Sequence, residues 1–325
     1  MNIVDHVFDN LNSKHVTTLY PLGDLHVGAL NCAEKALKVL VKEIADDPNA
    51  VWLGGGDLID AVTLKDNKRF DVGNLPEWLI NDKSGSARFM LGDLIKAQKD
   101  RFLDIVDPIK DKCLGLIEGN HEFDIYKHYG RDLQNELVTE LDTVNLTDMA
   151  FIRLIFRTNY RSVNKSLDRK SSKARENNEG SRGRVITVLA CHGMGGGRTA
   201  GAEANKLARL AADKDCDILL TGHSHSFCIP APVPMMYVSR STKCTPISFL
   251  TREKYVANWG SMMYTYAKGP STYASRANYP VRPMYTVRAV IEPFKQKHIS
   301  NNCGETDTCQ GNIRLEQVKL HDRSE

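Results

Sequence analysis

Hydrophobic and polar positions follow two different spacings along the first two-thirds of the chain. Short apolar runs predict buried strands, and stretches with apolar residues three and four positions apart predict helices. Strands are expected at residues 16–22, 50–53, 113–117, 151–156, 184–190 and 217–221, and helices at residues 32–46, 88–106, 125–141 and 203–212. This order predicts an α/β protein of βαβ type with a mainly parallel or mixed sheet.

The pattern changes beyond residue 230, where prolines separate short β-like runs at residues 235–239, 247–250 and 285–291. These runs predict a second, more antiparallel sheet. Residues 64–87 are mostly polar around an apolar island at Trp78, which is consistent with a lid over a site and equally with a packed surface excursion. We expect one domain over residues 1–325, with a β-rich C-terminal part from about residue 230.

Composition favours an ordinary globular protein. The 325 residues are 42% hydrophobic and 26% charged, which is enough for a full core. No apolar run approaches the roughly twenty residues of a membrane helix, and the first twenty residues lack a signal-peptide core. Eight cysteines, mostly in apolar stretches, favour a reducing compartment. We therefore expect a soluble, cytoplasmic protein with no membrane partner.

Charge argues against a strongly basic nucleic-acid-binding protein, because the net charge is only +3. The basic residues are nevertheless unevenly spread. Residues 157–184 contain nine Lys or Arg against three acidic residues, together with Ser, Asn and Gly. This composition predicts an exposed basic loop inserted at about residues 157–184.

Five short motifs rich in metal-binding residue types each follow a predicted strand. They are Gly23-Asp24-Leu25-His26, Gly56-Asp57, Gly119-Asn120-His121-Glu122, His192-Gly193 and Gly222-His223-Ser224-His225. Residues i and i+2 of an extended chain share a side, so Asp24 and His26 can face one ion. Any one motif commonly has a structural role, but all five in order, where α/β proteins place their chemistry, predict a dinuclear metal site.

On these motifs the chain resembles the calcineurin-like metallophosphoesterase superfamily over about residues 16–225. The resemblance implies a four-layer α/β/β/α sandwich with mixed central sheets and two metal ions at the sheet edge. It also implies a role for each motif residue. Asp24, His26 and His225 would hold the first ion, Asn120, His192 and His223 the second, Asp57 would bridge both, and His121 would be the catalytic histidine.

A dinuclear site has a well-defined chemistry. Two divalent ions about 3.5–4 Å apart polarise phosphoryl oxygens, generate hydroxide from a shared water near neutral pH and stabilise an in-line displacement. His121 would act as general acid at the leaving oxygen, a contribution of about 10²–10⁴-fold. Mixed oxygen and nitrogen ligands suit several metals; manganese is our expectation, with iron, zinc, nickel and magnesium as alternatives.

The sequence differs at two places from the protein phosphatases of the superfamily, and these differences indicate to which branch the chain is more similar. Protein phosphatases in it carry Asp-Arg-Gly after the second motif and an Arg before Asn-His-Glu, whereas this chain has Asp60-Ala61-Val62 and Glu118. The glycine-rich stretch from His192 to Arg198 resembles phage-encoded metallophosphoesterases and the DNA-repair exonuclease branch. Arg198 and nearby amides are candidates for gripping a substrate phosphate, although the glycines would equally serve as a hinge.

Aromatic residues gather near the C-terminal end of the chain. Six of the eleven tyrosines lie between Tyr255 and Tyr285, with Trp259, Arg276 and Arg282 among them. Such residues can stack on bases and grip phosphates, and they are also typical of the half-buried face of a strand.

Three functions stay open on the sequence. The leading hypothesis is a metal-dependent phosphodiesterase, acting as a DNA or RNA nuclease in the host cytoplasm if a bacteriophage encodes it. The alternative is a phosphomonoesterase on protein or nucleotide phosphates. A non-catalytic scaffold is the third, and the complete ligand set with His121 speaks against it.

Overall fold

Two mixed sheets form the centre of the computed structural model, which describes residues 1–61, 75–80, 91–158, 182–195, 199–238, 249–266, 280–301 and 304–320. In spatial order, the six-stranded sheet contains β1 (Asn2–Leu11), β5 (Met149–Thr158), β6 (Arg182–Cys191), β7 (Ile218–Thr221), β9 (Phe249–Asn258) and β8 (Val233–Val238). The five-stranded sheet contains β11 (Gly304–Lys319), β10 (Tyr285–Asn301), β2 (Thr17–Leu22), β3 (Ala50–Gly54) and β4 (Cys113–Leu116).

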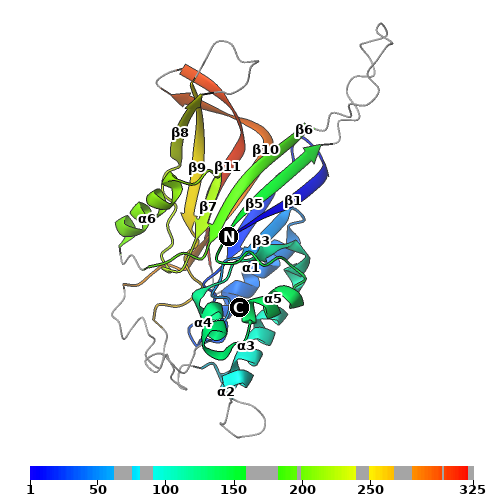
Figure 1. Ribbon diagram of the computed structural model, residues 1–325, viewed down its shortest axis with the longest axis vertical. Helices are drawn as coiled ribbons and strands as arrows, with labels where there is room; N and C mark the ends of the chain where they lie inside the picture. The colour runs from blue at the N-terminus through cyan, green and yellow to red at the C-terminus, as the bar shows by residue number, and fades with distance from the viewer. Residues whose placement is uncertain are drawn as a thin grey trace.

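Helices cover the outer faces of both sheets (Figure 1). Along the chain, α1 (Glu34–Asp46) lies between β2 and β3, whereas α2 (Glu77–Ile80), α3 (Leu91–Val106) and the 3-10 helix η2 (Asp107–Lys112) lie between β3 and β4. Two further helices, α4 (Asn120–Tyr129) and α5 (Leu133–Glu140), follow β4. The six-stranded sheet is covered by α6 (Ala200–Ala212), which packs on β9. The expected four-layer α/β/β/α sandwich with mixed sheets is confirmed.

The main cores lie on either side of the five-stranded sheet. Leu37 and Leu40 of α1 recur at helical spacing and are buried against its outer face. Between the sheets, Leu53 of β3 packs with Leu154 and Phe156 of β5, all fully buried. Each such side chain stabilises the fold by about 1.5–3 kcal/mol, so these layers fix the positions of the strand ends.

Parallel pairing brings the motif-bearing turns to one edge. β2 pairs in parallel with β3, and β3 with β4, while β6 pairs in parallel with β7 in the other sheet. Backbone hydrogen bonds continue beyond the strand ends, from the Asp24 amide to the Gly56 carbonyl at 2.9 Å and from the Gly222 amide to the His192 carbonyl at 3.0 Å. The turns after β2, β3, β6 and β7 are therefore held side by side.

Three expectations from the sequence need correction. The helix expected at residues 125–141 is two helices, because Gly130 takes a left-handed φ of 66° and ends α4. The C-terminal strands form no separate antiparallel sheet: β8 and β9 extend one central sheet, and β10 and β11 the other. The edge strand β1 was not expected at all. Apolar residues such as Ile3 and Val7 occupy its exposed positions, so the alternation of apolar and polar residues that marks a strand is not visible.

The apolar island at Trp78 is packed in the part that the structure describes. Leu79 is buried against Leu75 and Leu94, and the Arg101 guanidinium lies over the Trp78 ring at 5.4 Å. The remaining residues of 64–87, and most of the expected basic loop, lie outside the described residues. None of the described helices is long and apolar enough to span a membrane.

Candidate metal centre

The turns that carry the expected ligands have an unusual backbone. Five of the seven expected ligands take left-handed φ angles between 49° and 66°, namely Asp24, His26, Asp57, His223 and His225. A non-glycine residue in this region costs about 1–3 kcal/mol and persists only where surrounding structure imposes it. Here the turns are held by their mutual backbone hydrogen bonds, and the strain points the ligand side chains toward one another.

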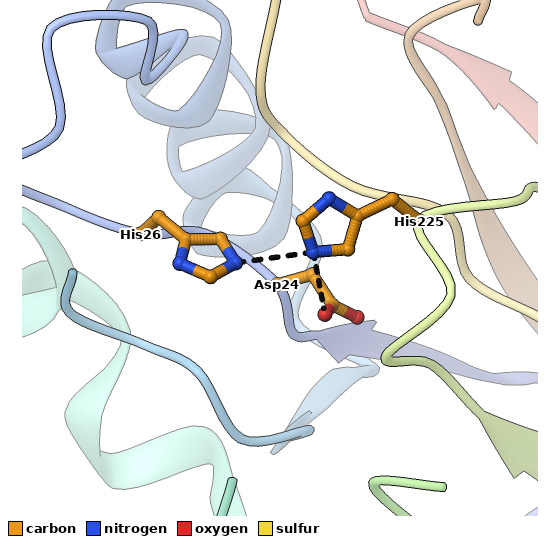
Figure 2. Close-up of side chains that lie close together, drawn as sticks. All are labelled: Asp24, His26 and His225. Atoms are coloured by element: carbon orange, nitrogen blue, oxygen red, sulfur yellow. Dashed lines mark hydrogen bonds and ion pairs between the residues drawn. The ribbon is translucent and has the colours of Figure 1, made fainter. Parts of the chain in front are cut away.

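Asp24, His26 and His225 form the first cluster. Nε2 of His225 lies 3.2 Å from Nε2 of His26 and 3.2 Å from Oδ1 of Asp24, and Figure 2 shows both contacts converging on this nitrogen. Asp24 and His26 are buried. Burial lowers the pKa of His26, which favours the neutral imidazole that a metal requires.

Asn120, His192 and His223 form the second cluster. Oδ1 of Asn120 lies 2.8 Å from Nδ1 of His223 and 3.2 Å from Nε2 of His192. Asp57 lies between the clusters, with Oδ2 3.2 Å from Nε2 of His192 and 3.9 Å from Nε2 of His26. The structure thus brings together all seven side chains that the motifs implied.

His192 is oriented toward the second cluster by the hydrogen bond on its other nitrogen. Its Nδ1 lies 2.8 Å from the Gly55 carbonyl, which can only accept, so Nδ1 carries the proton and Nε2 faces the cluster. Burial alone would lower the pKa of His192, but the neighbouring Asp57 carboxylate raises it to about 10. The concentration of negative charge that produces this shift would equally favour a metal cation.

His121 lies beside the two clusters without belonging to either set of three. Its Nδ1 donates to the Asp60 carbonyl, and its Nε2 lies 4.0 Å from Oδ2 of Asp57. Burial lowers the pKa of His121, and the Asp57 and Asp60 carboxylates outweigh burial and raise it overall. The geometry leaves Nε2 available to donate a proton, which suits the expected general acid.

The donor atoms fit divalent metal ions. Oδ1 of Asp24 and Nδ1 of His26 are buried and make no hydrogen bond among the described residues; they face His225 at 3.2 Å and Asp60 at 3.7 Å. Three groups of three side chains place their donor atoms within 4.8 Å of one another: Asp24 with His26 and His225, Asp57 with His192 and His223, and His26 with Asp60 and His121. Carboxylate oxygen with imidazole nitrogen suits first-row transition metals.

Several residues that the motifs did not single out support the ligands. The Glu122 carboxylate accepts hydrogen bonds from the amides of Asp57 at 2.9 Å, Leu58 at 2.8 Å and Gly119 at 3.0 Å, and so joins two ligand turns. Buried Asn258 donates to the Gly222 carbonyl at 3.1 Å. Glu122 could have been suspected from its place in a motif, whereas nothing local marks Asn258, which is 36 residues from Gly222.

The remaining candidates have mixed outcomes. Arg198 lies outside the described residues, so its expected phosphate contact stays a prediction. Trp259 is only 1% exposed, which excludes it from base stacking, and Tyr255 is also buried. Arg282 lies beside the site, because Nη1 donates to the carbonyl of Ser224 between two histidine ligands.

Comparison with known proteins agrees with this geometry. The family model described as calcineurin-like phosphoesterase matches residues 18–227, and the chain belongs to this family. The protein is therefore a phosphoric ester hydrolase of a metal-dependent family. No curated protein matches the chain.

Solved structures with low sequence identity also match. An uncharacterised Streptococcus pneumoniae protein, described as a phosphoesterase, is 10% identical with a TM-score of 0.31, and the match covers 95% of each chain. A calcineurin-like phosphoesterase from Bacillus subtilis is 10% identical with a TM-score of 0.35, over 93% of this chain and 90% of that one. A Staphylococcus aureus protein described as a 5′-nucleotidase is 13% identical with a TM-score of 0.41, over 95% of this chain and 55% of that one.

Proposed function

We propose that this protein hydrolyses phosphodiesters with two divalent metal ions, preferentially manganese, and that its substrate is DNA or RNA. The observation that carries the proposal is the position of Asp57, whose Oδ2 faces His192 of one cluster and His26 of the other. A carboxylate oxygen between two groups of ligands is suited to bridging two cations. Ions so placed would polarise the phosphoryl oxygens and lower the pKa of an attacking water.

The charge around the site favours a diester over a monoester. A phosphomonoester carries close to two negative charges at neutral pH, since its second pKa is about 6, whereas a diester carries one. At the two positions where phosphatases of the superfamily hold arginines, this chain has Ala61, only 2% exposed, and Glu118. Burial raises the pKa of Glu118, which favours its neutral form, but neither form of a glutamate is a cation that could pair with a doubly charged phosphomonoester.

The chain's own residues supply the remaining steps. The Asp57 amide donates to the Glu122 carboxylate and the His121 amide donates to Oδ1 of Asp57, at 2.9 Å each, so that Asp57 is tied to the start of α4. His121, held through Nδ1 by the Asp60 carbonyl, would donate the proton on Nε2 to the leaving oxygen. Arg282 beside Ser224 would bind a non-bridging phosphate oxygen.

A nucleic-acid substrate is supported by the chain's local charge. Residues 157–184 are strongly basic and lead into β6, the strand that ends at Cys191 directly before His192. Basic side chains that neutralise successive phosphates provide sequence-independent affinity for a nucleic-acid backbone. Cytoplasmic location and bacteriophage origin accompany this proposal as predictions.

The test is cleavage of single-stranded and double-stranded DNA and of RNA by purified protein with Mn²⁺ or with EDTA. We expect cleavage with Mn²⁺, none with EDTA and none by the isosteric variant Asp57→Asn. Asp5→Asn, which removes a half-exposed carboxylate from β1, is the matched control and should cleave like the wild type. Hydrolysis confined to nucleotide or protein monoesters would establish the alternative, and metal binding without turnover of any phosphoester would indicate a scaffold.

A further inference from the structure

Trp259 lies beneath three of the turns that carry metal ligands. It follows β9 directly, is 1% exposed, and its amide donates to the Thr221 carbonyl at the end of β7 at 3.0 Å. This position places the indole ring between the carboxyl ends of strands from both sheets.

Three glycines make room for this ring because they carry no Cβ atom. A Cβ atom at Gly23 would lie 2.6 Å from Nε1 of Trp259, and a Cβ atom at Gly55 would lie 2.6 Å from Cζ2. A Cβ atom at Gly222 would also collide with the indole. Each glycine begins or precedes a ligand motif, in the turns after β2, β3 and β7 respectively. The indole therefore sets the spacing between the three turns.

The indole N–H also selects which oxygen of Asp24 is left for a ligand. Nε1 of Trp259 donates to Oδ2 of Asp24 at 2.7 Å, and the His223 amide donates to the same oxygen at 2.9 Å. Oδ1 is left facing Nε2 of His225 at 3.2 Å. A second hydrogen bond, from Oγ of Ser261 to the Asp24 carbonyl at 2.9 Å, fixes the backbone of the same residue.

We propose that Trp259 is a positioning residue of the metal centre and determines the affinity for the ion held by Asp24, His26 and His225. The inference rests on the proposed dinuclear centre and assigns Trp259 no contact with substrate. Residues that orient metal ligands through hydrogen bonds typically change metal affinity by about 10–100-fold when they are replaced. The second ion should be much less affected, since none of its ligand side chains is bonded to the indole among the described residues.

The chain offers a matched control in Trp52. This residue is also fully buried, and its Nε1 donates to the Ile109 carbonyl at 2.7 Å, under η2 and away from the ligand turns. Trp52→Phe and Trp259→Phe each remove one buried indole hydrogen bond and a similar volume. A general loss of packing should therefore affect both variants alike.

The experiment is calorimetric titration of metal-free wild type, Trp259→Phe and Trp52→Phe with Mn²⁺. We expect two bound ions in the wild type, about 10–100-fold weaker binding of one ion in Trp259→Phe, and unchanged binding in Trp52→Phe. Unchanged constants in Trp259→Phe, or an equal loss in Trp52→Phe, would overturn the inference. Because the readout is metal binding, its failure is distinguished from failure of the proposed nuclease activity.

A second variant covers the case in which Trp259→Phe does not fold. Gly23→Ala keeps the indole N–H but adds a methyl group 2.6 Å from Nε1 and 2.9 Å from Cα of Gly55. We expect weaker binding of the ion held by Asp24, His26 and His225. Two constants equal to those of the wild type would contradict a positioning role for this contact.

Discussion

His121 shows how one side chain can be held in place and still be free to react. The Asp60 carbonyl fixes the proton on Nδ1, and the surrounding carboxylates raise the pKa of the imidazole despite its burial. The raised pKa favours the cationic imidazole, and the other nitrogen lies 4.0 Å from Oδ2 of Asp57. A general acid needs both properties.

His121→Ala should therefore separate catalysis from metal binding. We expect kcat for diester hydrolysis to fall by about 10²–10⁴-fold while the two Mn²⁺ dissociation constants change little. His128→Ala, on the same helix, is the control and should retain wild-type kcat. A parallel loss of metal affinity in His121→Ala would identify the residue as a ligand rather than as the acid.

The break between α4 and α5 depends on the left-handed backbone of Gly130. A Cβ atom there would meet nothing within 4 Å, so substitution introduces backbone strain without a steric clash. Gly130→Ala should lower the free energy of unfolding by about 1 kcal/mol. Gly201→Ala, the same change in the first turn of α6 and equally free of clashes, should raise it by up to about 0.5 kcal/mol. The midpoints of urea unfolding measure both, and shifts of equal sign would contradict this account.

An ion pair stabilises the same region between α4 and α5. Nε of Arg131 donates to the Glu136 carboxylate of α5 at 2.7 Å, and Nζ of Lys99 of α3 lies 3.1 Å from the same carboxylate. These contacts, the Arg131 hydrogen bond first among them, lower the pKa of Glu136 to about 2. Because the pKa is lower in the folded than in the unfolded chain, the pair stabilises the fold above about pH 4.5 and loses this effect as the pH falls toward 2.

Glu136→Gln should consequently reduce stability in a pH-dependent manner. The side chain is about one-third exposed, so we expect a loss of no more than about 1 kcal/mol at pH 7 and convergence with the wild type near pH 2. Urea midpoints measured from pH 7 downward would show this. A difference that stays constant over the whole range would mean that the pair contributes through packing instead.

At the scale of the whole molecule, the local sequence pattern predicted those features that depend on residues close together in the sequence. The strands before each motif were visible because they are buried and largely apolar, and the side chains of the two clusters were visible because their residue types recur after those strands. β11 was missed, since many of its residues are polar; they pair with β10 through the backbone and through ion pairs such as Glu316 with Arg288. Trp259 was assigned to an aromatic cluster because its contact with Asp24 spans 235 residues, which no local pattern reveals.

The two ions should link the halves of the sandwich. Asp24, Asp57 and Asn120 follow strands of the five-stranded sheet, whereas the ligand histidines 192, 223 and 225 follow strands of the other. Metal bound only by the folded state stabilises it by about 2.7 kcal/mol when free metal is at 100 times its dissociation constant. Calorimetric melting should give a higher Tm with Mn²⁺ than with EDTA, and Asp57→Asn should lose most of the difference. Equal Tm values for the wild type would contradict a metal site between the sheets.

The central claim is that this site cleaves phosphodiesters with two metal ions. The most direct measurement is kcat/KM for bis-p-nitrophenyl phosphate and for p-nitrophenyl phosphate, as metal-free protein is titrated with Mn²⁺. We predict that diester hydrolysis exceeds monoester hydrolysis, rises until two Mn²⁺ are bound per chain and is absent in Asp57→Asn. Preference for the monoester, or full activity in Asp57→Asn, would contradict the account.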